Sequence, residues 1–426
     1  ATGRGYKGKE RVATRRAGRA LPTGTIARSL LFAACSLGVR AMTALAMPAV
    51  RATMLGPDAA GLRRAGELLR AGKLVAFPTE TVYGLGANAL NEEAVLDIFR
   101  VKGRPLTDPL IVHVPTPDMA LQLFEADKAT ATIVDVLATA FWPGPLTLVA
   151  KAAASLPLCV SAGTGFVGVR CPAHAVAVAM LTEAAVPVAA PSANRFGHVS
   201  PTTAQHVLDD LGTHDIAVLD APGCDVGIES TVAKIDAHNS ELLLLRRGGV
   251  SESALRAALD KAGLGHFAVR AKSREEPAVV ADGVAAVAPG QLLTHYAPDK
   301  PTFLAVVPPA GTPPTASESA ATAAPVDSGE LASSCVVDFG GRLAHLAGDC
   351  AAYRDLSPAG SVSEAARVLF DTLRWTESVE AAQRVLLVDL MALRVSDEHV
   401  GALYDRMFRA ASGRRVPMGE AQWTKR

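Results

Sequence analysis

The stretch KGRPLTDPLIVHV, residues 102–114, places two cations just before a short apolar run. Lys102 offers a compact ammonium and Arg104 a planar fork of donors, and the two together suit a polyphosphate. A Lys-x-Arg pair on its own is usually a solvated helix end. Here residues 110–114 predict a buried strand directly after the pair. We therefore expect both cations at one end of a sheet, facing solvent in the ligand-free protein.

Three further polar clusters interrupt apolar sequence: FPTETVYGLG at 77–86, APSANRFGHVSP at 190–201 and GIESTV at 227–232. In the first cluster, Thr79 and Thr81 follow an apolar run, at the strand end where α/β proteins bind ligands. In the second, we expect a helix capped near Ser200, whose amides could hold phosphate oxygens. Simple turn and helix capping is the alternative that the residues leave open.

From residue 58 onward, helical and strand periods alternate, which indicates an α/β fold. Helices are expected at 58–71, 91–99, 129–141, 173–184, 202–211 and 252–262. Strands are expected at 74–77, 110–114, 146–150, 167–170, 186–190, 216–219, 231–235 and 242–245. Because strands outnumber helices, we expect a twisted mixed sheet with flanking helices rather than a regular doubly wound sheet.

Composition and pattern divide the chain into four segments: an N-terminal extension (1–53), a larger α/β domain (54–270), a linker (271–300) and a small α/β domain (301–426). In the last of these, strands are expected at 303–307, 335–339 and 385–390, and helices at 362–373 and 398–411. Small and polar residues crowd out large apolar ones at 308–334, which predicts a low-complexity insertion without a core. This domain shows no polar constellation of its own, so we expect a regulatory, lid or interface role.

The first 50 residues hold nine Lys or Arg and one acid, Glu10. That composition is typical of an organellar transit peptide, for a mitochondrion or a plastid. An upstream extension with a mis-assigned start explains it equally well, in which case we expect a cytoplasmic protein. Its apolar run at 30–35 is far shorter than the ~20 residues that cross a bilayer. No membrane association is expected.

Length and composition predict a globular protein: 426 residues, 49% apolar and 20% charged. A formal net charge of zero and 5% aromatic residues argue against bulk electrostatic binding of nucleic acid. The six cysteines have no CxxC spacing, which disfavours a zinc site and a disulfide framework. We expect reduced thiols and no protein-bound metal.

The ordered motifs PTETVYGLG, KGRP, PLIVHV, PSAN, ESTV, LRRGG and PGQLLTHYAP together resemble the YrdC-like family in its long two-domain form. The resemblance is close over residues 57–298 and looser beyond them. It implies a YrdC-like catalytic domain at 54–270 with a twisted mixed sheet, a linker at 271–300 that covers the active site, and a smaller, Rossmann-like C-terminal α/β domain. It also implies a nucleotidyltransferase that makes threonylcarbamoyl-AMP from L-threonine, bicarbonate and ATP and releases pyrophosphate.

The resemblance also assigns roles to individual residues. Lys102 and Arg104 become the catalytic cations that hold the phosphates. The implied threonine contacts are Thr81, His113, Arg170, Ala190 and Ser230. The implied nucleotide contacts are Lys102, Arg104, Asp108, Ser192, Asn194, Ser200, Arg246, His295 and Tyr296. A core histidine is the common alternative for His113.

Two residues depart from the family pattern. Asp108 stands where the family usually has Asn, and an acid beside a polyphosphate is repulsive unless magnesium or a proton intervenes. Phe166 stands where the family usually has Thr, so one hydrogen bond to the nucleotide is either missing or supplied by Thr164 instead. Magnesium is expected to arrive with the nucleotide.

The implied product serves tRNA N6-threonylcarbamoyladenosine modification through a tRNA threonylcarbamoyl transferase complex. Weak binding to RNA, including double-stranded RNA, is a further expectation. One alternative is a YrdC-like RNA-binding protein without this activity, marked by a basic groove with interleaved aromatics. Another is a carbamoyl-transferring hydrogenase-maturation enzyme, but the zinc-finger cysteines of that longer class do not occur here.

Overall fold

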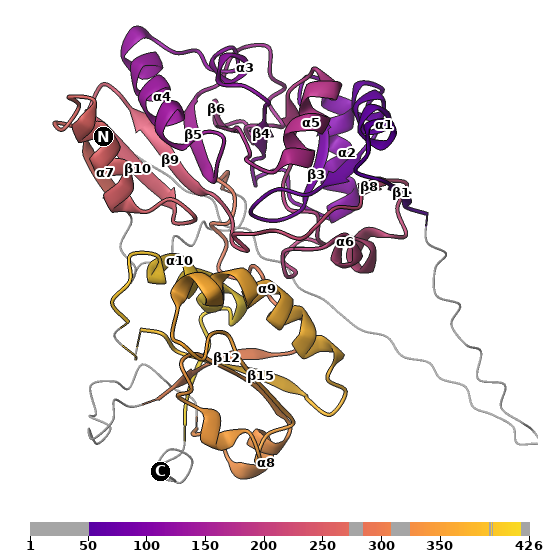
Figure 1. Ribbon diagram of the computed structural model, residues 1–426, viewed down its shortest axis with the longest axis vertical. Coiled ribbons are helices and arrows are strands. Elements are labelled where there is room, and N and C mark those ends of the chain that lie inside the picture. The colour runs from indigo at the N-terminus through magenta and orange to yellow at the C-terminus, as the bar shows by residue number, and fades with distance from the viewer. Residues whose placement is uncertain (1–50, 272–283, 308–323, 392, 394, 419–426) are drawn as a thin grey trace, which may run out of the picture. The chain divides into compact units, whose positions relative to one another are not determined.

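The computed structural model describes residues 51–271, 284–307, 324–391, 393 and 395–418 (Figure 1). These residues form two sheets, one of eleven strands and one of five. The expected α/β class, with a large mixed sheet and a second sheet at the C-terminus, is confirmed. The predicted extension at 1–53 lies outside the described residues except for 51–53.

The large sheet has mixed strand directions. Its strands are, in spatial order, β1 (Thr53–Leu55), β8 (Ala217–Leu219), β2 (Val75–Phe77), β3 (Gly84–Asn88), β7 (Val188–Ala189), β4 (Ile111–His113), β6 (Phe166–Arg170), β5 (Leu146–Lys151), β9 (Thr231–Asp236), β10 (Glu241–Arg246) and β11 (Ala268–Ala271). Strand β6 runs parallel to β4 on one side and antiparallel to β5 on the other. The carboxyl ends of β2, β4 and β6 carry Thr79–Thr81, His113 and Arg170.

Helices cover both faces of this sheet, as the alternation along β2 shows. Val75 and Phe77 pack against the helices of one face, whereas Ala76 belongs to the core on the other face. The first face is covered by α1 (Ala59–Arg70) and α5 (Ala175–Ala184), which lie together in Figure 1. The core of the other face includes α2 (Glu92–Lys102), α4 (Lys128–Phe141), α6 (Ala204–Leu211) and α7 (Glu252–Lys261), and the short α3 (Pro117–Leu121) precedes α4.

The two ends of α2 place the cationic motif. The side chain of Asn91 accepts a hydrogen bond from the amide of Ala94, as the sequence predicted. Gly103 ends the helix in the left-handed conformation, with φ of 64°, which favours glycine. Lys102 is therefore the last helical residue, and the chain turns sharply before Arg104.

Three strands of the large sheet, β1, β3 and β11, were not predicted from the sequence. Strand β3 contains two glycines and lacks an apolar run, yet a Cβ at Gly86 would lie 2.8 Å from a side-chain carbon of Val188. Close packing explains the glycine there. Strand β11 is short and half exposed, and it pairs in parallel with β10 where the linker was expected to begin.

The second sheet is wholly parallel. Its strands are, in spatial order, β14 (Ala352–Asp355), β13 (Ser334–Asp338), β15 (Arg384–Val388), β12 (Thr302–Val306) and β16 (Arg415–Pro417). Helices α9 (Val362–Ser378) and α10 (Val400–Ala410) contribute Leu369, Phe370 and Leu403 to its core. Among the described ranges, no helix has the length and apolar character needed to cross a bilayer.

The predicted low-complexity insertion at 308–334 is too long at its C-terminal end. Residues 308–323 lie outside the described residues, but those from 324 onward belong to the fold. Val326 forms a β-bridge with Met418, and Leu331 on α8 (Ser328–Ala332) is buried. A capping box between Asp327 and Glu330 starts that helix. The contacts of Val326 and Leu331 and the capping box therefore order this segment, although its composition of small residues predicted that it would have no core.

Candidate active site

A cavity of about 50 Å³ lies where the ends of β2, β4 and β6 meet residues 289–296. Most of the residues predicted to form the site line it: Thr81, Arg104, His113, Arg170, Ala190, Ser192, Ser230, Arg246, His295 and Tyr296. The others, Lys102, Asp108, Asn194 and Ser200, stand directly behind the lining, and each bonds to a residue within it. The structure thus gathers the predicted residues around one cavity.

Arg170, at the end of β6, is fixed on three sides. One terminal nitrogen donates to Thr81 Oγ1 at 2.9 Å, and Nε donates to the carbonyl of Gly144 at 3.2 Å. The other terminal nitrogen forms a buried ion pair of 2.7 Å with Glu80. Because side chains from two strand ends are locked together, the guanidinium has a single orientation toward the cavity.

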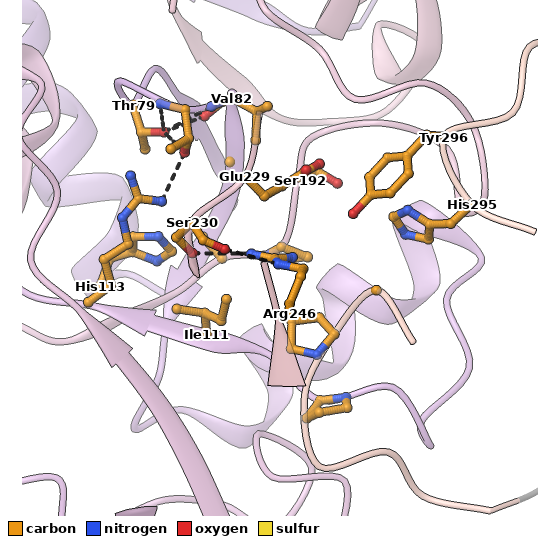
Figure 2. A pocket seen from close by; sticks show the side chains of 18 of the residues that line it. Thr79, Val82, Ile111, His113, Ser192, Glu229, Ser230, Arg246, His295 and Tyr296 are labelled. Atoms are coloured by element: carbon orange, nitrogen blue, oxygen red, sulfur yellow. Dashed lines mark hydrogen bonds between the residues drawn. The ribbon is translucent and has the colours of Figure 1, made fainter. Parts of the chain in front are cut away.

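A second cluster of polar side chains, Thr147, Ser230 and Arg246, lies on or next to strands β5, β9 and β10. The hydroxyl of Ser230 lies 2.7 Å from that of Thr147. Arg246 donates to both the hydroxyl and the carbonyl of Ser230, each at 3.1 Å. Figure 2 shows Arg246 extended toward Ser230, while His295 and Tyr296 come from a separate segment. These bonds fix a cation and a hydroxyl side by side.

His113 ends β4 and is buried, with its ring edge-on to Phe77 at 5.9 Å. Burial, together with the nearby charge of Arg170, lowers the pKa of His113 to about 3. His113 is therefore neutral at physiological pH. It can offer a hydrogen bond or an apolar edge to the cavity, but it supplies no charge.

Lys102 does not face solvent, contrary to the prediction. It is buried, and its ammonium donates to the carbonyls of Ser192, at 2.6 Å, and Asn194. Burial lowers the pKa of Lys102 well below its usual value, and the neighbouring Arg104 lowers it further. The sequence could not reveal these two carbonyl acceptors, which come from a loop 90 residues further along the chain. Lys102 thus stabilises the loop that contains Ser192 and Asn194.

Arg104 is also buried rather than solvent-facing. It donates to the carbonyls of Asp108, at 3.1 Å, and Pro109, at 2.8 Å, and forms an ion pair of 2.9 Å with the Asp108 carboxylate. Burial raises the pKa of Asp108, whereas the attraction of Arg104 opposes the rise. An acid is therefore tolerated at this departure from the family pattern because the adjacent cation is its partner.

The loop 190–201 is closed by its own hydrogen bonds. Ser192 donates to the side-chain oxygen of Asn194 at 2.5 Å, and the Asn194 amide donates to the carbonyls of Arg195 and His198. Ser200 is not the predicted helix cap, because Thr203 caps α6. The Ser200 hydroxyl instead donates to Glu229, at 2.8 Å, in the cavity wall.

Residues 289–296 form the last wall of the cavity. Their path needs glycine at 290, where φ is 80° and a Cβ would lie 3.2 Å from the Tyr296 hydroxyl. That hydroxyl is buried and has no hydrogen-bond partner among the described residues. Burial raises the pKa of Tyr296 to about 12 and lowers that of His295 well below its usual value. Both side chains are therefore neutral.

Sequence reasoning gave no role to two buried polar residues, Thr147 and Glu229, and it placed Glu80 at a ligand-binding strand end without assigning it a specific contact. Glu80 and Glu229 lie inside PTET and IEST, next to residues that were assigned to the site, and this proximity in the sequence could have identified them as site residues. Thr147 lies within an apolar strand and gave no such signal. Thr164, the expected substitute for a hydrogen bond at Phe166, bonds to Ser161 and does not line the cavity.

The carboxylates nearest the cavity are committed to cations. Glu80 pairs with Arg170, Asp108 with Arg104 and Glu229 with Arg406. Within the described part of the chain, one group of three side chains has metal-ligating spacing, namely His198, Asp299 and Glu377. None of the three lines the cavity, and all three hydrogen-bond to other protein groups.

Comparison with known proteins places this chain in a family. Residues 67–248 match the Sua5/YciO/YrdC family, described as "Telomere recombination", and residues 250–412 match the family described as "Threonylcarbamoyl-AMP synthase, C-terminal domain". A putative threonylcarbamoyl-AMP synthase of Mycobacterium tuberculosis is 34% identical over 210 residues, 47% of this chain and 89% of that relative. The chain belongs to the Sua5/YciO/YrdC family.

Longer relatives match both in sequence and in structure. The threonylcarbamoyl-AMP synthase of Pyrococcus abyssi is 42% identical over 237 residues, 56% of this chain. That of Bacillus subtilis is 40% identical over 247 residues, again 56% of this chain. Each alignment spans 65% of the relative's own length. The crystal structure of P. abyssi Sua5 complexed with L-threonine superposes with a TM-score of 0.68 at 31% identity, covering 86% of this chain and 99% of that one.

Proposed function

We propose that this protein is a threonylcarbamoyl-AMP synthase, a nucleotidyltransferase that condenses L-threonine, bicarbonate and ATP. The observation that carries the proposal is the convergence on one cavity of the Arg170–Thr81 pair and the cations Arg104 and Arg246. The family relationship supports it, because a relative with 31% identity was crystallised with L-threonine.

The fixed guanidinium of Arg170 suits the carboxylate of an amino acid. The threonine carboxylate would accept hydrogen bonds from Arg170, whose orientation is held by the ion pair with Glu80 behind the cavity lining. Neutral His113 and the small Ala190 would enclose the side chain. A polar contact to the threonine hydroxyl would discriminate against amino acids that lack it, because a buried partner without a hydrogen bond is costly.

Arg104 and Arg246 line the cavity, and Lys102 stands behind it, bonded to Ser192. We assign these cations to the triphosphate, with magnesium carried by the phosphates, because the carboxylates nearest the cavity are already paired. The threonine nitrogen would attack the carbon of bicarbonate, a C–O bond would break, and the departing hydroxide would leave as water with the proton from nitrogen, which yields the carbamate. A carbamate oxygen would then form a bond to the α-phosphorus while the bond to pyrophosphate breaks. The residues contribute positioning and charge stabilisation.

The product would serve tRNA threonylcarbamoyladenosine modification after transfer by a second enzyme.

Because the cavity of about 50 Å³ is smaller than these substrates, binding must displace side chains or the segment 289–296 that closes it.

Omission experiments test this activity. Pyrophosphate release from ATP is measured with L-threonine and bicarbonate, then with each omitted, and then with serine in place of threonine. The proposal predicts release that requires both co-substrates and is slower with serine. ATP hydrolysis that ignores threonine, or the absence of any release by folded protein, would exclude the assignment.

A further inference from the structure

Arg406, on α10 of the C-terminal domain, reaches the wall of the cavity. It is fully buried, and its Nε lies 3.0 Å from a carboxylate oxygen of Glu229. A terminal nitrogen donates to the carbonyl of Arg247 at 2.6 Å. The guanidinium also lies 5.7 Å from the centre of the Tyr296 ring. A side chain from one domain thus contacts two residues that line the cavity formed largely by the other.

Glu229 is shared between the cavity and the C-terminal domain, because it lines the cavity and pairs with Arg406. It lines the cavity, where its second carboxylate oxygen accepts a hydrogen bond from Ser200 at 2.8 Å. Within the described residues, Arg406 is the one side chain that forms an ion pair with it. Asp405 lies 3.3 Å from Arg406 but also pairs with Arg409 at 3.0 Å. The Arg406 guanidinium is therefore available to balance Glu229.

A carboxylate in this position conflicts with the proposed ligand. At a separation of a few ångströms inside a protein, two like charges repel each other strongly. A buried Glu229 without a partner would therefore oppose a polyphosphate in the same cavity. The cations that attract the phosphates, Arg104 and Arg246, would be partly cancelled by it.

We propose that Arg406 is a positioning residue for the nucleotide, which neutralises Glu229 and holds it against the cavity wall so that the polyphosphate can bind. The C-terminal domain then supplies part of the electrostatics of the active site. This inference rests on the proposed function, and it gives that domain a role in nucleotide affinity.

A second arginine of the same domain provides a matched control. Arg374, on α9, is also buried and forms an ion pair of 3.0 Å with Asp210, a residue of the large-sheet domain. It also donates to the carbonyl of Val199. Asp210 does not line the cavity. Loss of Arg374 therefore weakens the contact between the domains without exposing a carboxylate to the nucleotide.

The test compares Arg406→Met, Glu229→Gln, their combination and Arg374→Met in the full chain. Michaelis constants for ATP and L-threonine are measured by pyrophosphate release. We expect Arg406→Met to raise the constant for ATP about 10- to 100-fold, because it leaves a bare carboxylate beside the phosphates. Glu229→Gln alone should not raise it. Adding Glu229→Gln to Arg406→Met should restore ATP binding, because no charge then remains unpaired.

If Arg406→Met does not fold, the Michaelis constant for ATP is measured instead with Arg406→Lys, which keeps the positive charge. A smaller rise for Arg406→Lys, or recovery in the double variant, supports the proposal. An equal effect of Arg374→Met, or no recovery when Glu229→Gln is added, would overturn it, because a purely structural loss is not rescued by removing the second partner.

Calorimetric titration with inorganic pyrophosphate separates this inference from the proposed activity. If the wild-type chain shows no threonine-dependent turnover, the proposed function fails, but the anion still tests the electrostatic role. We expect weaker pyrophosphate binding by Arg406→Met and recovery in the double variant. Equal binding by all variants, or no binding by the wild type, would overturn the inference.

Discussion

The guanidinium of Arg104 and the carboxylate of Asp108 form a buried ion pair of 2.9 Å in the cavity wall. They are four residues apart in the loop between α2 and β4, and their side chains are 3% and 5% exposed. Arg104 is one of the cations that we assign to the triphosphate. A phosphate must therefore compete with Asp108 for it.

Replacing Asp108 with Asn should strengthen nucleotide binding. Arg104 keeps its bonds to the two carbonyls but loses the competing negative charge, so the Michaelis constant for ATP should fall by about three- to tenfold. Asp135→Asn, at an exposed position on α4, is the control for a general change of charge. An increase in the constant would mean that Asp108 contributes to binding, through a metal ion or a hydrogen bond.

Arg170→Lys should weaken threonine binding selectively. Lysine retains the charge but cannot contact Thr81, Glu80 and a ligand carboxylate with one planar group. The loss of a buried, charge-assisted contact predicts a rise of about 100-fold in the Michaelis constant for threonine. Arg64→Lys, at an exposed position on α1, should change nothing. A larger rise for ATP than for threonine would contradict the assignment.

The sequence predicted the elements whose apolar pattern follows from burial. Strand β4 and helix α2 were predicted close to their observed bounds, because an apolar run and an Asn cap mark them. Strand β3 was missed because close packing at Gly86 excludes the side chains that usually signal a strand. The exposure of Lys102 was predicted wrongly because its carbonyl partners come from a distant loop.

The contribution of α10 to the site was also beyond sequence reasoning. In the segment VGALYDRMFRA, Arg406 looks like part of a solvated helix face. Its partner Glu229 lies 177 residues earlier in the chain. Only the packing of the two domains shows that this charge is buried, so an interface role was expected but no residue could be named.

The segment from residue 324 onward should matter for stability. Leu331 is 3% exposed in the core of the second sheet, so Leu331→Ala should lower the free energy of unfolding by about 2–5 kcal/mol. Leu158→Ala, at a side chain that is 72% exposed, is the matched control. The measurement is denaturant unfolding of both variants. Equal stability would restore the original prediction that this whole insertion lies outside the core.

His198 should make stability depend on pH. Its ring nitrogens lie 2.8 Å from Asp210 and 2.9 Å from Glu377, a residue of α9. Burial alone would lower the pKa of His198, but these two carboxylates outweigh it and raise the pKa above 6.5. Protonated His198 therefore stabilises the fold fully at a pH below the pKa that the histidine has in the unfolded chain. This stabilisation is lost as the pH rises through the higher pKa of the folded state.

Melting temperatures measured from about pH 6 to 9 check this dependence. His198→Gln should flatten the decline that the wild type shows as pH rises, and His266→Gln, at an exposed histidine, should leave it in place. The same decline in His198→Gln would show that another group is responsible.

Direct detection of the product tests the central claim most closely. The protein is incubated with ATP, L-threonine and isotope-labelled bicarbonate, and the nucleotides are separated and analysed by mass spectrometry. The proposed function predicts an adenylate that carries both threonine and the labelled carbon, formed in step with pyrophosphate. If pyrophosphate appears with unmodified AMP alone, or if the labelled carbon is absent from the adenylate, the protein is not a threonylcarbamoyl-AMP synthase.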